Sequence, residues 1–374
     1  MTMTPDIFQY IDTHAAEAQQ LLIDLAQIPA PSNHEERRAQ FCLNWLRSKG
    51  ADAAYIDEAL NVIYPIGDTG ENDLMVFMAH SDVVFPDTAP LPLRIENGRI
   101  YCPGVGDDTA NAVALLTVAG YIAEKKLSHR DCGVLLVINS GEEGLGNLKG
   151  SRKIMADFGS RVREFITFDG NANAIVTKAV GSRRYRVTVT TEGGHSYGRF
   201  GAPNAIAHLA QLITRLYQVQ VPPIGKTTYN VGTISGGTSV NTIAQEATML
   251  YEFRSDEREG LSFMQAQFDA IVEKFRASGV EIQTEVVGDR PCGLDVDNSV
   301  LAQRAAKAVQ THYGFSPALT SGSTDCNVPL SMGISAICPG CVLGAGAHTR
   351  EEYVEIDSLL PGLKVAAELI LYYF

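Results

Sequence analysis

The stretch 74-LMVFMAHSDVV-84 begins with a run of six apolar residues that ends at a histidine, and it introduces the pattern of the first half of the chain. Similar apolar runs follow at VLLVIN (134–139) and FITF (165–168), and a helical stretch, DTANAVALLTVAGYIAEKK (108–126), separates the first two runs. Strands that alternate with helices in this way build a largely parallel sheet covered by helices. The sequence therefore predicts an α/β domain.

The hydrophobic period changes near residue 182, where SRRYRVTVTTEGG alternates strictly between apolar and polar residues. The β-α-β-β-α order that follows predicts a small α+β domain with one solvent-facing side of its sheet. Its expected elements are a strand at 182–194, a helix at 202–218, strands at 227–237 and 246–255, and a helix at 261–278.

The first pattern returns from about residue 290, with a helical segment at 298–314 and a strand at 334–338. A chain of 374 residues also exceeds the size at which a single core usually stops growing. We therefore expect a discontinuous catalytic domain, residues 1–180 and 289–374, interrupted by an inserted domain at residues 181–288.

Charge and composition restrict the partners. The net charge of −13, with an isoelectric point near 5.1, would repel nucleic acid and anionic lipid, and no basic cluster offsets it locally. Residues 1–27 carry acidic side chains where a signal peptide would need basic ones, and no stretch approaches the roughly 18 apolar residues of a membrane span. We expect no nucleic acid or membrane partner, and a cytoplasmic location with reduced thiols for the seven cysteines.

Five short segments place an imidazole or a carboxylate just past an apolar run or at the start of a helix. They are AHSDVV with His80 and Asp82, PGVGDDTANAV with Asp107, INSGEEGLG with Glu142 and Glu143, FDGN with Asp169, and GAHTREEY with His348. Histidines mixed with carboxylates are the ligands that a pair of hydrolytic divalent ions requires. All five segments are expected at the same side of an open α/β sheet, where sites form.

Each residue has a plain structural interpretation as well. His80 could be a loop histidine beside a capping aspartate, Asp107 could cap a helix, and Asp169 could belong to an ordinary turn. The adjacent Glu142 and Glu143 are harder to explain, because two like charges together cost free energy unless a cation or a proton compensates them. The joint pattern therefore favours a metal site over a binding protein without chemistry.

A two-ion arrangement also balances its charge. If Asp107 bridges both ions, His80 and Asp169 can complete one site, and Glu143 and His348 the other. Three carboxylates then face two divalent cations, and a bridging hydroxide would cancel the remaining charge.

The motifs, their order, the inserted domain and its GGHS segment resemble the family-twenty metallopeptidases from end to end of the chain. That family includes peptidase T, the glutamate carboxypeptidases and the acylamino-acid deacylases. The resemblance implies two zinc ions, with cobalt or manganese as alternatives, held by the five ligands above. It also implies a cis peptide bond after Asp107 and an inserted domain that serves as a lid and forms a homodimer.

The resemblance assigns further roles within the reaction. Asp82 would orient His80, and Glu142 would act as the general base that moves the proton of the attacking water to the leaving amine. His195 of GGHS would stabilise the oxyanion, often across a dimer, although it could also be a simple turn histidine.

Other positions match the substrate pocket of the family. Asn241 in SVNTIA and Arg254 in YEFRSD would grip a substrate carboxylate, for which arginine offers a bidentate fork. Ser321, Gly322 and Ser323 begin the SGSTDCN loop that would line the same pocket.

The substrate expected from these motifs is a small peptide. Deacylases and carboxypeptidases of the family generally have Glu where this chain has Asp169, whereas peptidase T has Asp, so the sequence favours a di- or tripeptide aminopeptidase. An N-acyl-amino-acid deacylase or carboxypeptidase of the same fold is the alternative.

Cys338 and Cys341 form the only CxxC pair. A thioredoxin-type motif opens a helix, whereas VLGAGAH follows this pair, so we predict buried structural cysteines and leave a redox role open.

Overall fold

The computed structural model describes residues 5–70, 73–129 and 132–374. The first four residues of the N-terminal segment lie outside these ranges. The chain divides into two compact units, one made of Met1–Ala179 with Leu294–Phe374 and the other of Val180–Gly293.

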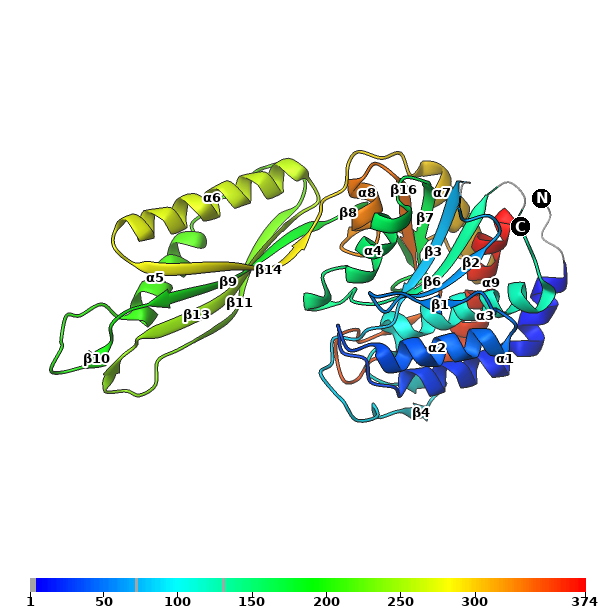
Figure 1. Cartoon of the computed structure of the whole chain (residues 1–374), viewed down its shortest axis with the longest axis horizontal. Coiled ribbons are helices and arrows are strands. Elements are labelled where there is room, and N and C mark those ends of the chain that lie inside the picture. The colour runs from blue at the N-terminus through cyan, green and yellow to red at the C-terminus, as the bar shows by residue number, and fades with distance from the viewer. Residues whose placement is uncertain (1–4, 71–72, 130–131) are drawn as a thin grey trace. The chain divides into compact units, whose positions relative to one another are not determined.

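The first unit is built on a large sheet, which among the described residues has eight strands in the order β1-β2-β6-β3-β7-β16-β8-β15 (Figure 1). The four neighbours β6, β3, β7 and β16 run parallel, whereas β1 and β2 at one edge are antiparallel, as is the pairing of β16 with β8. The strands are β1 (Tyr55–Ile56), β2 (Val62–Ile66), β3 (Leu74–His80), β6 (Gly133–Asn139), β7 (Val162–Thr167), β8 (Ala174–Ala179), β15 (Ala318–Gly322) and β16 (Ser335–Pro339). The predicted α/β class with a mostly parallel sheet is confirmed.

Helices cover both faces of this sheet. One face packs against α1 (Pro5–Ala26), α2 (Glu36–Ser48), α3 (Ala110–Lys125), α7 (Ser299–Tyr313) and α9 (Ile356–Ile370), and the other against α4 (Lys149–Phe158) and α8 (Asn327–Ser331). Residues 110–123 of α3 are all buried, which is why its sequence is apolar around the whole helix. Every residue of β6 is buried too, as expected of a strand covered on both faces.

A small antiparallel sheet, which the sequence pattern did not predict, lies in the same unit. Its order is β17-β18-β5-β4, with β4 (Arg94–Glu96), β5 (Arg99–Tyr101), β17 (Gly344–Ala345) and β18 (Tyr353–Glu355). Tyr353 of β18 stands opposite Tyr101 of β5. This pairing joins the chain just before Asp107 to the chain just after His348.

The second unit is an antiparallel sheet in the order β11-β13-β9-β14, packed on two helices. Its elements are β9 (Gly181–Thr190), β10 (Gly194–His195), α5 (Ala205–Leu216), β11 (Thr227–Gly236), β12 (Thr242–Ile243), β13 (Glu246–Ser255), α6 (Arg258–Ala277) and β14 (Glu281–Arg290). The sequence pattern missed β14, because that strand is largely polar and its alternation is interrupted by a bulge between Val286 and Gly288.

Within the described ranges, no helix is long and apolar enough to cross a membrane.

Candidate metal centre

The candidate site lies where the parallel strands of the first unit end. His80 is the last residue of β3, Glu142 and Glu143 follow β6, and Asp169 follows β7. The register pairs His80 with Asn139, the last residue of β6, so both strands end at the same level. The carboxyl ends of neighbouring parallel strands are where sites form in open α/β sheets.

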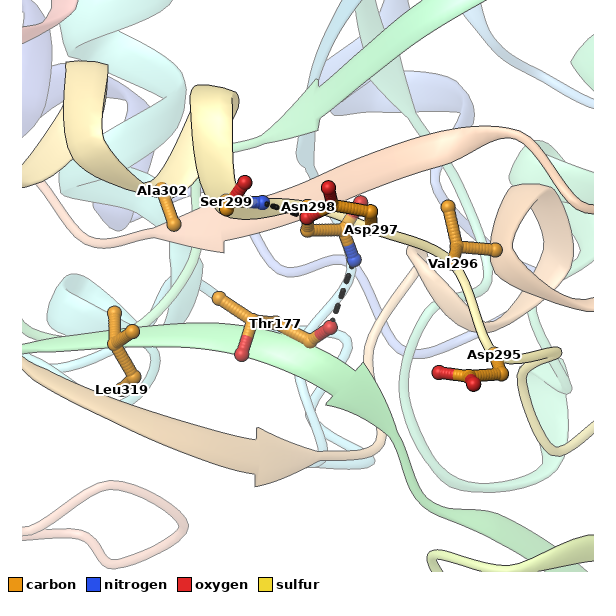
Figure 2. Close-up of a pocket in the computed structure, with 8 residues that line it drawn as sticks. All are labelled: Thr177, Asp295, Val296, Asp297, Asn298, Ser299, Ala302 and Leu319. Atoms are coloured by element: carbon orange, nitrogen blue, oxygen red, sulfur yellow. Dashed lines mark hydrogen bonds between the residues drawn. The ribbon is translucent and has the colours of Figure 1, made fainter.

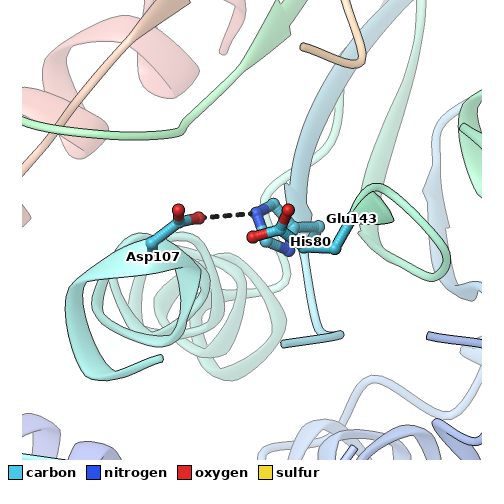
Figure 3. Close-up of side chains that lie close together, drawn as sticks. All are labelled: His80, Asp107 and Glu143. Atoms are coloured by element: carbon cyan, nitrogen blue, oxygen red, sulfur yellow. Dashed lines mark hydrogen bonds and ion pairs between the residues drawn. The ribbon is translucent and has the colours of Figure 1, made fainter. Parts of the chain in front are cut away.

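Asp107 lies between two histidines. Its Oδ1 is 3.0 Å from Nε2 of His80, and its Oδ2 is 3.1 Å from Nε2 of His348. The same His348 nitrogen is 3.1 Å from Oε1 of Glu143. Figure 3 shows the carboxylate of Asp107 directed toward His80 beside Glu143. The carboxylate of Asp107 thus presents one oxygen to His80 and the other to His348.

A second group of ligand atoms shares His80 with the first. His80, Asp108 and Asp169 each have a ligand atom within 4.8 Å of the others. Asp108 is fully buried and its Oδ2 accepts a hydrogen bond of 2.9 Å from the backbone N–H of His80. A carboxylate at the start of a helix commonly serves as its cap, yet no side-chain cap is formed at the start of α3. The signal that could have found it is its position beside Asp107.

The peptide bond between Asp107 and Asp108 is cis, as the resemblance implied.

The carboxylates of the cluster crowd negative charge into a buried volume. Burial, reinforced by the charge of Asp107, raises the pKa of Asp169 to about 7. Burial also raises the pKa of Asp108 well above its ordinary value. Burial opposes ionisation of Asp107 as well, but hydrogen bonds from His348 and His80 outweigh it and lower the pKa of this carboxyl. A nearby positive charge is therefore needed if all these groups are to be ionised together.

Asp82 organises the turn that carries the two glutamates. Its carboxylate oxygens accept hydrogen bonds of 2.9 Å from the backbone N–H groups of Glu142 and Glu143 and one of 2.6 Å from the hydroxyl of Ser32. Nδ1 of His80 is 3.0 Å from the main-chain carbonyl oxygen of Asp82 and 3.4 Å from its Oδ1. Asp82 therefore contacts the imidazole mainly through its backbone, while its carboxylate holds the turn.

Arg38, which the sequence analysis did not identify, is a fully buried cation whose hydrogen bonds reach the loops of the candidate site. Its guanidinium donates to the carbonyl oxygens of Ser81, Ile28 and Ala26 and to the hydroxyl of Thr109. Burial lowers the pKa of Arg38 to about 10. Two of these acceptors, Ser81 and Thr109, lie within two residues of His80 and Asp107, respectively. The side chain of Arg38 therefore connects α2 to the loops that carry these two candidate ligands. An arginine in an amphipathic helix gives no local signal of such a role.

The other residues that the resemblance assigned to catalysis or substrate binding lie mostly in the second unit. His195 is exposed in β10, whose partner strand β12 begins just after Asn241. Arg254, near the end of β13, holds Glu252 in a two-pronged ion pair at 2.9 and 3.0 Å. Its fork, expected to bind a substrate carboxylate, is occupied by a carboxylate of the chain itself.

Ser321 and Gly322 end the strand β15 of the first unit, and Ser323 follows it. A side chain at Gly322 would approach Val176 of β8 to 2.9 Å, so the strand pairing requires a small residue there.

Cys338 and Cys341 are reduced and buried, as predicted. Burial raises the pKa of both thiols well above the ordinary value. The backbone N–H of Cys341 donates to Asn111, whose amide in turn donates to Asp108. The segment thus supports the site through its backbone.

A separate pocket of about 450 Å³ lies at the start of α7 (Figure 2). The amide of Asn298 donates to the carbonyl oxygen of Thr177, and the backbone N–H of Ser299 donates to Asp297, so these polar groups are already bonded to one another. Its lining residues are Thr177, Asp295, Val296, Asp297, Asn298, Ser299, Ala302 and Leu319. This pocket is lined by residues of α7 and of the strands β8 and β15, and none of the candidate ligands lines it.

The donor set of the cluster suits divalent metal ions. It combines imidazole nitrogens and carboxylate oxygens, which zinc and related ions accept together. Burial, with repulsion from neighbouring carboxylates, raises the pKa of Asp108 and Asp169, so a bound cation would favour the ionised form of both groups. The residues present therefore fit a metal centre.

Comparison with known proteins agrees with this chemistry. The model of peptidase family M20/M25/M40 matches residues 76–372. An uncharacterised protein of Bacillus subtilis, YqjE, is 24% identical over 379 residues, which cover 93% of this chain and 96% of that protein. The structure of a tripeptidase from Staphylococcus aureus is 23% identical with a TM-score of 0.77, covering 96% of this chain and 98% of the other. The dipeptidase Dug1p from Saccharomyces cerevisiae is 17% identical with a TM-score of 0.78, covering 98% of each chain.

Proposed function

Since the chain belongs to peptidase family M20/M25/M40 and is therefore a metallopeptidase or a related amidohydrolase, we propose that it cleaves the first amide bond of di- and tripeptides. The observation that carries the proposal is the placement of Asp107 between His80 and His348 at the ends of the parallel strands. Asp169, found where deacylases of the family generally have Glu, favours an aminopeptidase. The similar folds of a tripeptidase and a dipeptidase support the same substrate class.

Two zinc ions would be held by this cluster, with cobalt or manganese able to replace them. The ligands would be His80, Asp107, Glu143, Asp169 and His348. When bound, the ions would lower the pKa of a water molecule and polarise the scissile carbonyl group.

The residues of the chain itself move the proton and hold the substrate. Glu142, positioned through its backbone by Asp82, accepts the proton of the attacking water and delivers it to the leaving amine. His195 donates a hydrogen bond to the oxyanion of the tetrahedral intermediate. Asn241 and Arg254 bind the substrate carboxylate, which must then displace Glu252 from the arginine fork.

A substrate panel tests this function at both ends of the peptide. Ala-Ala and Ala-Ala-Ala are expected to be hydrolysed, whereas N-acetylation should abolish cleavage because an aminopeptidase requires a free amine. Amidation of the carboxyl end should lower kcat/KM by roughly 10- to 100-fold, the scale of a lost charge-assisted hydrogen bond. In Arg254→Gln the same amidation should have little further effect, which assigns the loss to this residue.

The panel also separates the alternative activities. Preferred hydrolysis of N-acetylalanine would replace the aminopeptidase with a deacylase. Release of the last residue from an N-blocked peptide would indicate a carboxypeptidase.

We also propose that the second unit forms a homodimer. Its strand β11 pairs only with β13 among the described residues, so one edge is available to a second copy, and Ile234 on this strand is 56% exposed. Tyr197 and Phe200 are about nine-tenths exposed in the loop after His195. Sedimentation velocity should find a dimer, and Ile234→Lys should shift it toward monomer because lysine on an open edge opposes pairing. A monomer at all concentrations of the unsubstituted chain would rule this assembly out.

A further inference from the structure

Glu352 is a buried carboxylate bound to the turn that carries Asp107. It is 2% exposed, and its Oε1 accepts hydrogen bonds from the backbone N–H groups of Gly106 at 2.8 Å and Asp107 at 2.7 Å. Its Oε2 accepts a third bond, of 2.8 Å, from the N–H of Gly104. Three N–H groups of one turn thus share a single carboxylate. Burial raises the pKa of this carboxyl to about 7, and the three hydrogen bonds oppose that shift by favouring the ionised form.

The small sheet of the first unit places Glu352 there. Glu352 immediately precedes β18, and the pairing of Tyr353 with Tyr101 brings it beside the chain that leaves β5. The backbone carbonyl oxygen of Glu352 also accepts a hydrogen bond of 3.2 Å from the N–H of Cys102, which holds the two segments together. Glu352 lies four residues after His348. The same short segment therefore carries the candidate ligand His348 and holds the turn of the candidate ligand Asp107.

Glycines make the close approach possible. Gly104 has φ of +75°, a conformation that favours glycine. A Cβ at Gly106 would lie 3.2 Å from Oε1 of Glu352. The turn is therefore shaped to point its N–H groups at this carboxylate.

The direction of these N–H groups matters for Asp107. Aspartate side chains readily accept hydrogen bonds from N–H groups of their own turn. Here the N–H of Asp107 itself is bound by Glu352, and the two oxygens of Asp107 face His80 and His348. Glu352 therefore keeps the candidate bridging carboxylate available to ligands.

We propose that Glu352 is a positioning residue, which holds the Asp107 turn so that both carboxylate oxygens face the metal centre and the ions bind tightly. The inference rests on the proposed function, because it concerns the same two-ion site. Glu352 itself touches neither substrate nor ions. Its role is to connect the His348 segment with the turn of Asp107.

The test compares Glu352→Gln and Glu352→Ala with Glu351→Gln as a matched control. Glutamine keeps one oxygen for two of the three N–H groups, whereas alanine removes all three bonds. Glu351 is the adjacent residue, but its side chain is 74% exposed and pairs with Arg94 at the surface. The control therefore changes the charge of the same segment without touching the turn.

Cobalt is titrated into each full-length protein after chelation, with affinity followed by calorimetry and the site by the visible absorption of bound cobalt. We expect affinity to fall by roughly 10- to 100-fold in the Glu352 variants, the usual effect of losing a partner that supports a ligand. Alanine should be worse than glutamine, and the control should match the unsubstituted chain. At saturating cobalt, the absorption spectrum of the Glu352 variants should still differ, which a loss of stability alone would not produce.

Wild-type cobalt affinity and spectrum in Glu352→Gln would overturn the inference, as would an equal loss in the control. If the alanine variant does not fold, the glutamine variant decides. Failure of the unsubstituted chain to bind divalent ions would instead refute the proposed function, so the two failures can be told apart.

Discussion

Glu142→Gln is expected to lower kcat by roughly 10² to 10⁴, the usual contribution of a general base. Glutamine preserves the shape of the side chain but cannot accept a proton. The backbone N–H of residue 142 would still donate to Asp82, so the turn should keep its geometry. Metal content should therefore stay at the level of the unsubstituted chain while turnover falls.

The neighbouring Glu143→Gln should fail in a different way. Oε1 of Glu143 lies 3.1 Å from Nε2 of His348, within the cluster that would hold the ions. Loss of its charge should release or loosen one ion and reduce activity together with metal content. The measurement is metal stoichiometry beside kcat for both variants, with Glu351→Gln as the surface control.

The pattern of loss assigns the two roles. If Glu142→Gln loses an ion while Glu143→Gln keeps both, the roles of base and ligand must be exchanged. If neither substitution changes turnover, this pair has no part in catalysis.

Removal of divalent ions should lower the activity by a factor on the order of 10³ or more. The reason is that the ions would stabilise the charge of the transition state by several kcal/mol. Protein purified without chelators should contain close to two ions per chain. Activity should return on adding zinc, cobalt or manganese. Full activity in exhaustively chelated protein would end the two-ion hypothesis.

Chelation should also weaken the fold around the cluster. Burial raises the pKa of both Asp108 and Asp169, so without ions these groups bind protons or repel one another. A lower melting temperature of the chelated protein, restored by the ion that restores activity, is the expected result. An unchanged melting temperature would mean that the cluster needs no cation.

Local patterns identified the four parallel strands of the large sheet, β3, β6, β7 and β16, and the helices α3, α5, α6 and α7. The apolar runs at LMVFMA and VLLVIN form β3 and β6, and the helical stretch after Asp108 forms α3. Periodicity identifies such elements because each must bury an apolar face or surface. The strands β14, β5 and β18 were missed, since they are polar or only three residues long and gain their stability from neighbours distant in sequence.

Family membership was also available from the sequence, and it is confirmed. The five segments, their order and the GGHS segment resemble the motifs of that family, and this resemblance identified it. The expected ligand types could be written down from these segments alone. Their arrangement could not, because spacing along the chain does not state which oxygen meets which imidazole.

The sequence by itself determined the α/β class through local periodicity, and the family and the residues worth testing through the residue types of its motifs and their resemblance to a known family. Only the tertiary structure decided that Asp107 lies between His80 and His348, and that Asp108 is buried against the backbone of His80. The same is true of Arg38 in α2 and of Glu352 just before β18, which bond to the segments of Ser81 and Asp107, remote from them in sequence. Their roles consist of hydrogen bonds between segments up to about 250 residues apart, as between Glu352 and Asp107, and such contacts exist only once the chain has folded.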